Sequence, residues 1–158
     1  MNRKRVLLVI SLLALTLDSG PVWTEQSVAD CQIQVTEPTL GQEVAGRAKV
    51  EGTAKIPADH HLWVFARHES FRELDVWWPQ REGSVAPDTG KWKVSATLGG
   101  PQDLGDEFDV AVAVVAEQQD MRIREWFRVS MRAKDYQPIE MPAAVCVSPV
   151  LKVKKTRE

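Results

Sequence analysis

The chain has 158 residues, and its 20 lysines and arginines nearly balance its 22 aspartates and glutamates. A chain of this length usually forms one domain. The net charge of −2 lacks the basic surplus that nucleic-acid-binding proteins usually carry, so we expect no nucleic-acid partner. Six tryptophans and only two cysteines are the unusual features of the composition.

Residues 1–29 have the pattern of an export signal. Three basic residues, Arg3 to Arg5, precede the apolar run 6–17, in which only Ser11 and Thr16 are polar. The run is shorter than the roughly 20 apolar residues of a membrane-spanning helix and fits the apolar region of a signal peptide. A periplasmic or extracellular location follows from this interpretation.

We predict cleavage after Ala29, because Ser27 and Ala29 place small residues at the two positions that signal peptidase reads. The mature chain, residues 30–158, is then a single domain without a membrane span. Cleavage after Gly20 and an uncleaved anchor are weaker alternatives. A lipid anchor at Cys31 is a minor alternative, since Asp30 precedes the cysteine and the apolar run ends far upstream.

The two cysteines, Cys31 and Cys146, lie near opposite ends of the predicted mature chain. An even number of cysteines in an exported protein favours a disulfide over two free buried thiols. The alternation of the strands does not fit this pairing directly. Cys31 shares a face with Ile33 and Val35, whereas Cys146 should point away from the face of its neighbours Val145 and Val147. A bulge near Pro149 or an edge position would reconcile the pairing. Without a Cys-x-x-Cys motif, we expect no redox role.

Short apolar or alternating segments follow one another and are separated by turn residues. Residues 46–52 and 91–98 alternate between small or apolar and polar residues, as in strands with one face in solvent. Residues 62–66 and 108–115 are apolar on both faces, as in central strands. Further strands are expected at 31–35, 74–78 (ended by Pro79) and 145–153. The pattern predicts an antiparallel, immunoglobulin-like β-sandwich of about seven strands.

Residues 117–133 break the alternation and contain neither glycine nor proline. Ile123, Trp126, Phe127 and Met131 have near-helical spacing, which predicts one crossover helix before the last strand. A strand through 126–131 is the competing interpretation.

Several short motifs together resemble a group of bacterial extracytoplasmic immunoglobulin-like sandwich domains. They are Leu62-Trp63-Val64 with Arg67, Trp78-Pro79-Gln80, Gly90-Lys91-Trp92, Leu98-Gly99 with Asp103 and Gly105, and Phe108-Asp109-Val110. The resemblance covers about residues 33–115, and its motifs are turn glycines and core aromatics. It implies a fold and a compartment, and it assigns no activity or catalytic residue.

The histidines do not predict a metal site. His60 and His68 would stand roughly 26 Å apart along one extended strand, at about 3.3 Å per residue. His60 and His61 are adjacent and would face opposite sides of a strand. The acidic residues Asp103, Asp106, Glu107 and Asp109 have the composition of a solvated turn and lack the spacing of a calcium loop. We therefore expect no metal and no cofactor.

The sequence also lacks the common nucleophile, zinc-protease, phosphate-loop and dinucleotide motifs. We therefore expect no catalytic residues, and we interpret the protein as a non-enzyme.

The tryptophans are the best candidates for a binding site. Trp63 and Trp92 lie in apolar strands and are expected in the core, and Trp126 is expected to pack the helix on the sheet. Trp77 and Trp78 are adjacent in a strand and must face opposite sides, so one of them could meet solvent near Arg81. An exposed tryptophan suits a sugar ring or a protein partner. The alternative is that both belong to the core.

These observations favour an exported, non-catalytic binding module of the bacterial envelope that engages an envelope protein. The alternative is a small carbohydrate-binding module that uses Trp77 or Trp78 with Arg81. An enzyme or a metal carrier is less well supported.

Overall fold

The computed structural model describes residues 31–158. The expected signal peptide and its cleavage sites lie outside this range. The strands are β1 (Gln32–Glu37), β2 (Glu43–Ala45), β3 (Arg47–Lys55), β4 (His60–His68), β5 (Val76–Gly83), β6 (Lys91–Thr97), β7 (Glu107–Ala116), β8 (Ile139–Glu140), β9 (Cys146–Val147) and β10 (Leu151–Arg157). The helical elements are the 3-10 turns η2 (Glu69–Leu74) and η3 (Pro101–Asp103) and the helix α1 (Glu117–Ala133). Within residues 31–158, no helix is both long and apolar enough to cross a membrane.

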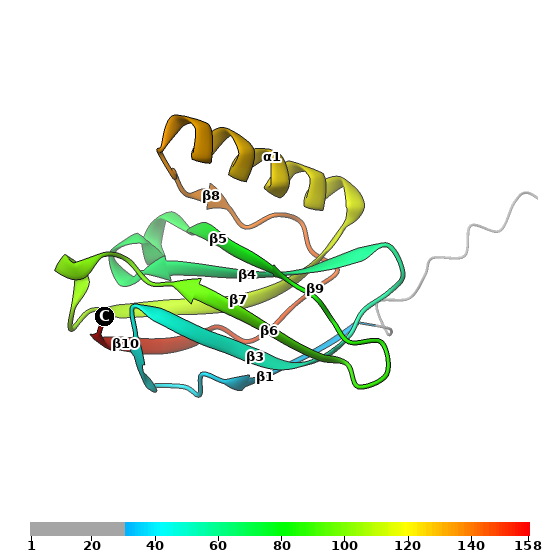
Figure 1. Ribbon diagram of the computed structural model, residues 1–158, viewed down its shortest axis with the longest axis horizontal. Helices are drawn as coiled ribbons and strands as arrows, with labels where there is room; N and C mark the ends of the chain where they lie inside the picture. The colour runs from blue at the N-terminus through cyan, green and yellow to red at the C-terminus, as the bar shows by residue number, and fades with distance from the viewer. Residues whose placement is uncertain (1–30) are drawn as a thin grey trace, which may run out of the picture.

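The strands form the two sheets of a β-sandwich (Figure 1). One sheet has the order β1-β3-β6, and the larger one has the order β2-β10-β7-β4-β5-β8, with β9 also paired to β7. Every pair is antiparallel except β2 with β10. The chain changes sheet after β1, β2, β3, β5 and β6, as in the Greek-key course of immunoglobulin-type sandwiches. The expected fold class is confirmed.

The main core fills the space between the two sheets. Strands β3 and β6 contribute every second residue, as their alternating sequences require. Strands β4 and β7 are buried on both faces, which explains their continuous apolar runs. The inward residues of β4 are Leu62, Val64 and Ala66, whereas Trp63 and Phe65 face the opposite side of the sheet.

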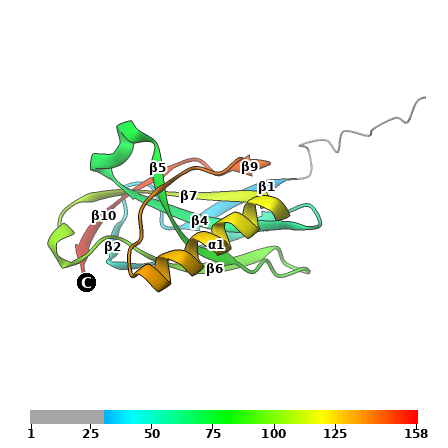
Figure 2. The same ribbon diagram turned by 90° about the horizontal axis from the view of Figure 1, so that it is seen from above.

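Helix α1 covers that opposite side, so the molecule has a third layer (Figures 1 and 2). Ile123 on the helix packs with Trp63, Phe65, Trp77 and small residues of β7 in a second apolar cluster. Glu117 and Asp120 lie in the first turn, where a carboxylate interacts favourably with the helix dipole. The helix prediction is confirmed, and the competing strand over 126–131 is wrong.

Pro79 and Pro149 affect the strands differently from what the sequence predicted. The strand expected at 74–78 spans Val76–Gly83 instead, with Leu74 exposed in η2. Pro79 does not end it: the β4–β5 register shifts between Val64 and Phe65, and this bulge accommodates a residue that has no N–H to donate. The last strand expected at 145–153 is two strands, β9 and β10, separated at Pro149.

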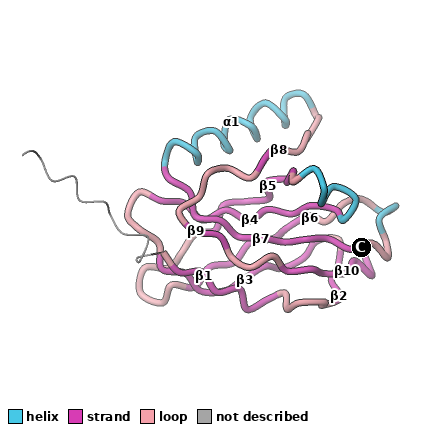
Figure 3. Tube along the Cα trace, turned by 180° about the vertical axis from the view of Figure 1, so that it is seen from behind, coloured by secondary structure: helices cyan, strands magenta, loops and turns pink. Residues whose placement is uncertain are grey.

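A disulfide joins Cys31 to Cys146 and brings β1 beside β9, as the view from behind shows (Figure 3). Cys146 pairs with Val114, whose side chain belongs to the core between the sheets, so Cys146 also points inward. Val147 is exposed on the other face. The short edge strand β9 thus resolves the expected conflict of faces. Because the Cys31 sulfur is in the disulfide, it is not available for the lipid anchor considered as a minor alternative.

Candidate binding cleft

The structure separates the two adjacent tryptophans of β5. Trp77 is only 3% exposed and belongs to the apolar cluster under α1. Its indole N–H donates to the Asp75 carboxylate at 3.2 Å, and the Arg67 guanidinium lies 4.2 Å from its ring centre. Of the two alternatives considered for Trp77, an exposed binding residue or a core residue, the structure therefore shows the second.

Trp78 is partly exposed and pairs with Ala66 of β4. Its ring meets Phe71 of η2 edge-on, with ring centres 5.0 Å apart. Its indole N–H donates to the backbone oxygen of Tyr136 at 2.7 Å, across 58 residues of sequence. These contacts hold the ring in one orientation while part of its surface remains accessible.

Trp78 lines a cleft of about 1110 Å³ that extends beside β5. Its walls come from β4, η2, β5, β6, η3, β7 and α1, together with the turn after the helix. Its aromatic lining consists of Trp63, Phe71, Trp78, Phe108, Trp126, Phe127 and Tyr136. Small-molecule sites usually measure about 300–1,000 Å³ and are mainly apolar with a few polar groups. This cleft is large enough for such a ligand or for a short segment of a partner.

On the helix side of the cleft, an indole hydrogen bond also ties α1 to the segment that follows it. Trp126 donates to the backbone oxygen of Gln137 at 3.0 Å, and its ring lies 6.0 Å from that of Tyr136. Phe127, rather than Trp126, packs against the apolar cluster and stacks with Trp63 at 5.7 Å. Together with Trp78, these contacts fix the turn that follows α1.

Arg81 is exposed and lines the cleft. Within the described chain, Arg67 and Arg124 on the same cleft are each paired with carboxylates, whereas the Arg81 guanidinium makes no hydrogen bond or ion pair. The structure therefore brings Trp78 and Arg81 together on one cleft and leaves Trp77 out of it. Arg81 is free to contact a ligand.

A buried ion cluster fixes the η2 wall. Asp109 is 1% exposed and accepts hydrogen bonds from Arg67 at 2.9 Å and from Arg72 at 2.8–3.1 Å. Burial by itself would raise the pKa of Asp109, but the two guanidinium groups outweigh it and lower that pKa below its usual value. Asp109 is thus not part of a solvated turn, as its sequence context suggested. Because Arg72 belongs to η2, the cluster also positions Phe71.

The other turn residues have local partners. Asp103 accepts from the backbone N–H of Gly100 at 2.7 Å, which is a turn contact of the expected kind. His68 bonds to Asp106 at 3.0 Å and to the Ser70 hydroxyl at 2.8 Å, and His60 bonds to the backbone oxygen of Ala58.

Sequence reasoning missed most of the cleft. Phe71 and Tyr136 were not among the candidate residues, and Phe127 and Met131 were considered only as part of the helix pattern. These residues come from separate elements, and no spacing rule connects Tyr136 to Trp78. The one usable signal was the tryptophan pair itself.

No protein-family model matches this chain, and the search of curated proteins found no significant match.

Proposed function

We propose that the protein is an exported, non-catalytic binding module of the bacterial envelope, and that it engages a protein partner through the cleft beside β5. The observation that carries the proposal is the gathering of partly exposed aromatic side chains, Met131 and Arg81 around one cleft. Tryptophan, tyrosine, phenylalanine, methionine and arginine are the residues enriched at protein interfaces.

Exposure at the rim of the cleft supports a macromolecular partner. Met131 is 59% exposed and Tyr136 is 48% exposed, so both offer apolar surface to water in the unbound protein. Trp78 and Arg81 line the same cleft, and buried tryptophan, tyrosine and arginine side chains dominate the affinity of many interfaces. The fixed orientation of Trp78 and Trp126 lowers the entropy cost of binding.

Export is supported by the signal-like sequence at residues 1–29 and by the Cys31–Cys146 disulfide. Disulfides persist in oxidising compartments such as the periplasm. The resemblance of residues 33–115 to extracytoplasmic bacterial domains agrees with this location.

Site-specific photo-crosslinking tests the proposal. A photoreactive amino acid replaces Met131, which lines the cleft, or Val129, which is 50% exposed on the same helix but lies outside the cleft lining. We expect a discrete adduct with an envelope protein from position 131 and none from position 129. Adding Trp78→Ala should remove the adduct. Equal crosslinking from both positions, or an adduct that survives Trp78→Ala, contradicts the proposal.

A glycan is the second candidate ligand. It is favoured by the partly exposed indole of Trp78 and the unpaired Arg81 on the same cleft, because sugar rings stack on indoles and their hydroxyls accept hydrogen bonds from guanidinium groups. A soluble cell-wall glycan should then change the tryptophan fluorescence and protect it from iodide. The change should disappear in Trp78→Ala. If no glycan changes the emission, the carbohydrate alternative is wrong.

A further inference from the structure

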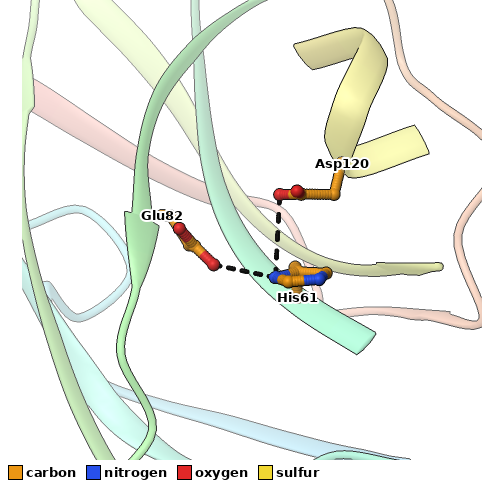
Figure 4. Close-up of side chains that lie close together, drawn as sticks. All are labelled: His61, Glu82 and Asp120. Atoms are coloured by element: carbon orange, nitrogen blue, oxygen red, sulfur yellow. Dashed lines mark hydrogen bonds and ion pairs between the residues drawn. The ribbon is translucent and has the colours of Figure 1, made fainter. Parts of the chain in front are cut away.

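A second group of side chains lies where β4, β5 and α1 meet, at the end of the cleft that Glu82 and Arg124 line. Its centre is the imidazole of His61 on β4, which faces Glu82 of β5 and Asp120 of α1 (Figure 4). Glu117 of α1 faces the other side of the same ring. Three elements that are distant in sequence thus contribute one imidazole and three carboxylates.

The donor atoms of three of these side chains converge. The Nδ1 atom of His61 lies 2.9 Å from Oε1 of Glu82 and 3.7 Å from Oδ1 of Asp120. All three donor atoms lie within 4.8 Å of one another. In a tetrahedral zinc site with bonds of about 2.0–2.2 Å, neighbouring donor atoms lie about 3.3–3.6 Å apart. Small side-chain movements would therefore bring these three atoms to zinc-binding distances.

We propose that His61, Glu82 and Asp120 form a zinc site in which Zn²⁺ bridges β4, β5 and α1. Nδ1 of His61, Oε1 of Glu82 and Oδ1 of Asp120 are the protein ligands, and water or a ligand atom takes the fourth position. Three protein ligands with an open fourth position are typical of non-structural zinc sites. The site is independent of which ligand occupies the cleft.

The surrounding contacts match those that orient metal ligands in proteins. Metal-binding histidines usually donate their second ring N–H to a carboxylate, and Nε2 of His61 lies 2.8 Å from Oε2 of Glu117. Arg124 holds the opposite oxygens, Oε2 of Glu82 and Oδ2 of Asp120. The oxygens that face His61 therefore remain directed toward the proposed ion.

Trp63 completes this support. Its indole N–H donates to Oδ1 of Asp120 at 2.9 Å, which leaves that oxygen a further lone pair. Asp120 is only 2% exposed, so its carboxylate is held in place and largely shielded from water.

The charges also favour a divalent cation. Glu82, Glu117 and Asp120 carry three negative charges, and Arg124 supplies one positive charge. A divalent ion would neutralise the remainder, whereas a proton on His61 leaves one negative charge at a partly buried site. In the metal-free protein both ring nitrogens lie within hydrogen-bond distance of carboxylates, so a protonated ring donates to both, and Zn²⁺ binding at Nδ1 displaces the proton from that nitrogen.

The ligand set selects among metals. An imidazole nitrogen beside two carboxylates favours zinc over calcium and magnesium, which prefer oxygen ligands. The Irving–Williams order places Zn²⁺ above Mn²⁺ for the same ligands.

Calorimetric titration of ZnCl₂ into the chelator-stripped, disulfide-bonded protein tests the site. We expect one Zn²⁺ per chain, weaker Mn²⁺ binding, and no Ca²⁺ binding. His61→Ala and Glu82→Gln should each lower the zinc affinity at least tenfold, and Glu117→Gln about tenfold, as the loss of orienting partners usually does. Zinc should also raise the thermal midpoint of the wild-type protein but not that of His61→Ala. Circular dichroism confirms that each variant is folded.

Two matched variants are the controls. His60→Ala removes the adjacent histidine, whose Nδ1 bonds to the backbone oxygen of Ala58. His68→Ala removes the histidine of a second cluster in residues 31–158, formed by His68, Asp103 and Asp106, whose donor atoms also lie within 4.8 Å of one another. Both should bind zinc as the wild type does. The proposal is overturned by the absence of binding at millimolar zinc, by an unchanged affinity in both His61→Ala and Glu82→Gln, or by loss of binding in His68→Ala instead.

Discussion

Trp77 and Trp78 are neighbours in β5, and they differ because successive side chains of a strand face opposite sides. Trp77→Ala leaves a cavity under α1 and should lower the free energy of unfolding by about 3–5 kcal/mol. Trp78→Ala removes one indole hydrogen bond and part of an aromatic contact, and should cost about 1–2 kcal/mol. Urea unfolding followed by circular dichroism measures both. Equal losses would mean that Trp78 is a core residue and would weaken its assignment to the binding site.

His61 makes the stability of the metal-free protein depend on pH. Burial lowers the pKa of His61, but the hydrogen bonds that its ring donates to Glu82 and Glu117, together with the charge of Asp120, outweigh burial and raise that pKa above its usual value of 6.5. The charged ring therefore stabilises the folded state fully below about pH 6.5. This contribution is lost as the pH rises through the folded-state pKa.

The change in unfolding midpoint between mildly acidic and mildly alkaline buffers measures this contribution, with a chelator present. In the wild type, the loss of the His61 charge should lower the unfolding midpoint in the alkaline buffer. We expect His61→Gln to lack this part of the decrease in midpoint, and His60→Gln to show the same decrease as the wild type. An identical pH profile for His61→Gln and wild type would show that the ring does not carry the charge.

At the scale of elements, the contribution of α1 to the stability of the fold depends on its contact with the larger sheet. Ile123 is buried among Trp63, Phe65 and the small residues of β7, whereas Val129 is half exposed. Ile123→Ala should lower the free energy of unfolding by about 3 kcal/mol, because it removes the helix residue at the centre of this contact. Val129→Ala should change it by less than about 0.5 kcal/mol. Chemical denaturation of both variants provides the comparison.

If Ile123→Ala were as mild as Val129→Ala, the helix would contribute little to the stability of the sandwich. The stacking of Phe127 on Trp63 would then be the contact to examine next.

The elements also show where sequence patterns were informative. Periodicity located α1 with the same bounds as the structure, because a segment without glycine or proline and with apolar residues at helical spacing has few alternatives. The same reasoning ended a strand at Pro79. It could not foresee that a register shift against β4 places this proline in a bulge. Strand pairing is a property of two segments, and the pattern of one segment does not contain it.

At the scale of the whole molecule, the Cys31–Cys146 disulfide closes a loop with a sequence separation of 115. In the loop-entropy account, a closure of this length stabilises the folded state by roughly 4–5 kcal/mol. The double variant Cys31→Ser, Cys146→Ser should lose about this amount in equilibrium unfolding. Reduction of the wild-type protein should have the same effect. A loss below about 1 kcal/mol would mean that the unfolded chain is already compact or that the bond strains the native state.

The three layers also explain why the cleft and the histidine group were not foreseen. From the sequence, a shared metal site could be judged only from the spacing of His60, His61 and His68 along one strand. The carboxylates that face His61 come from β5 and α1 instead. Likewise, Trp78 acquires Tyr136 as a partner only because the turn after α1 returns to the start of β5.

The sequence by itself determined the sandwich class and the position of the helix, and it favoured a disulfide between the two cysteines. These features follow from local periodicity, from turn residues and from the presence of only two cysteines. Tertiary structure decided which tryptophan is exposed, where the cleft lies, which charges meet at His61 and why Asp109 is buried. Those outcomes depend on register and on the packing of α1 over the larger sheet. Both are set by contacts between residues that are far apart in the chain.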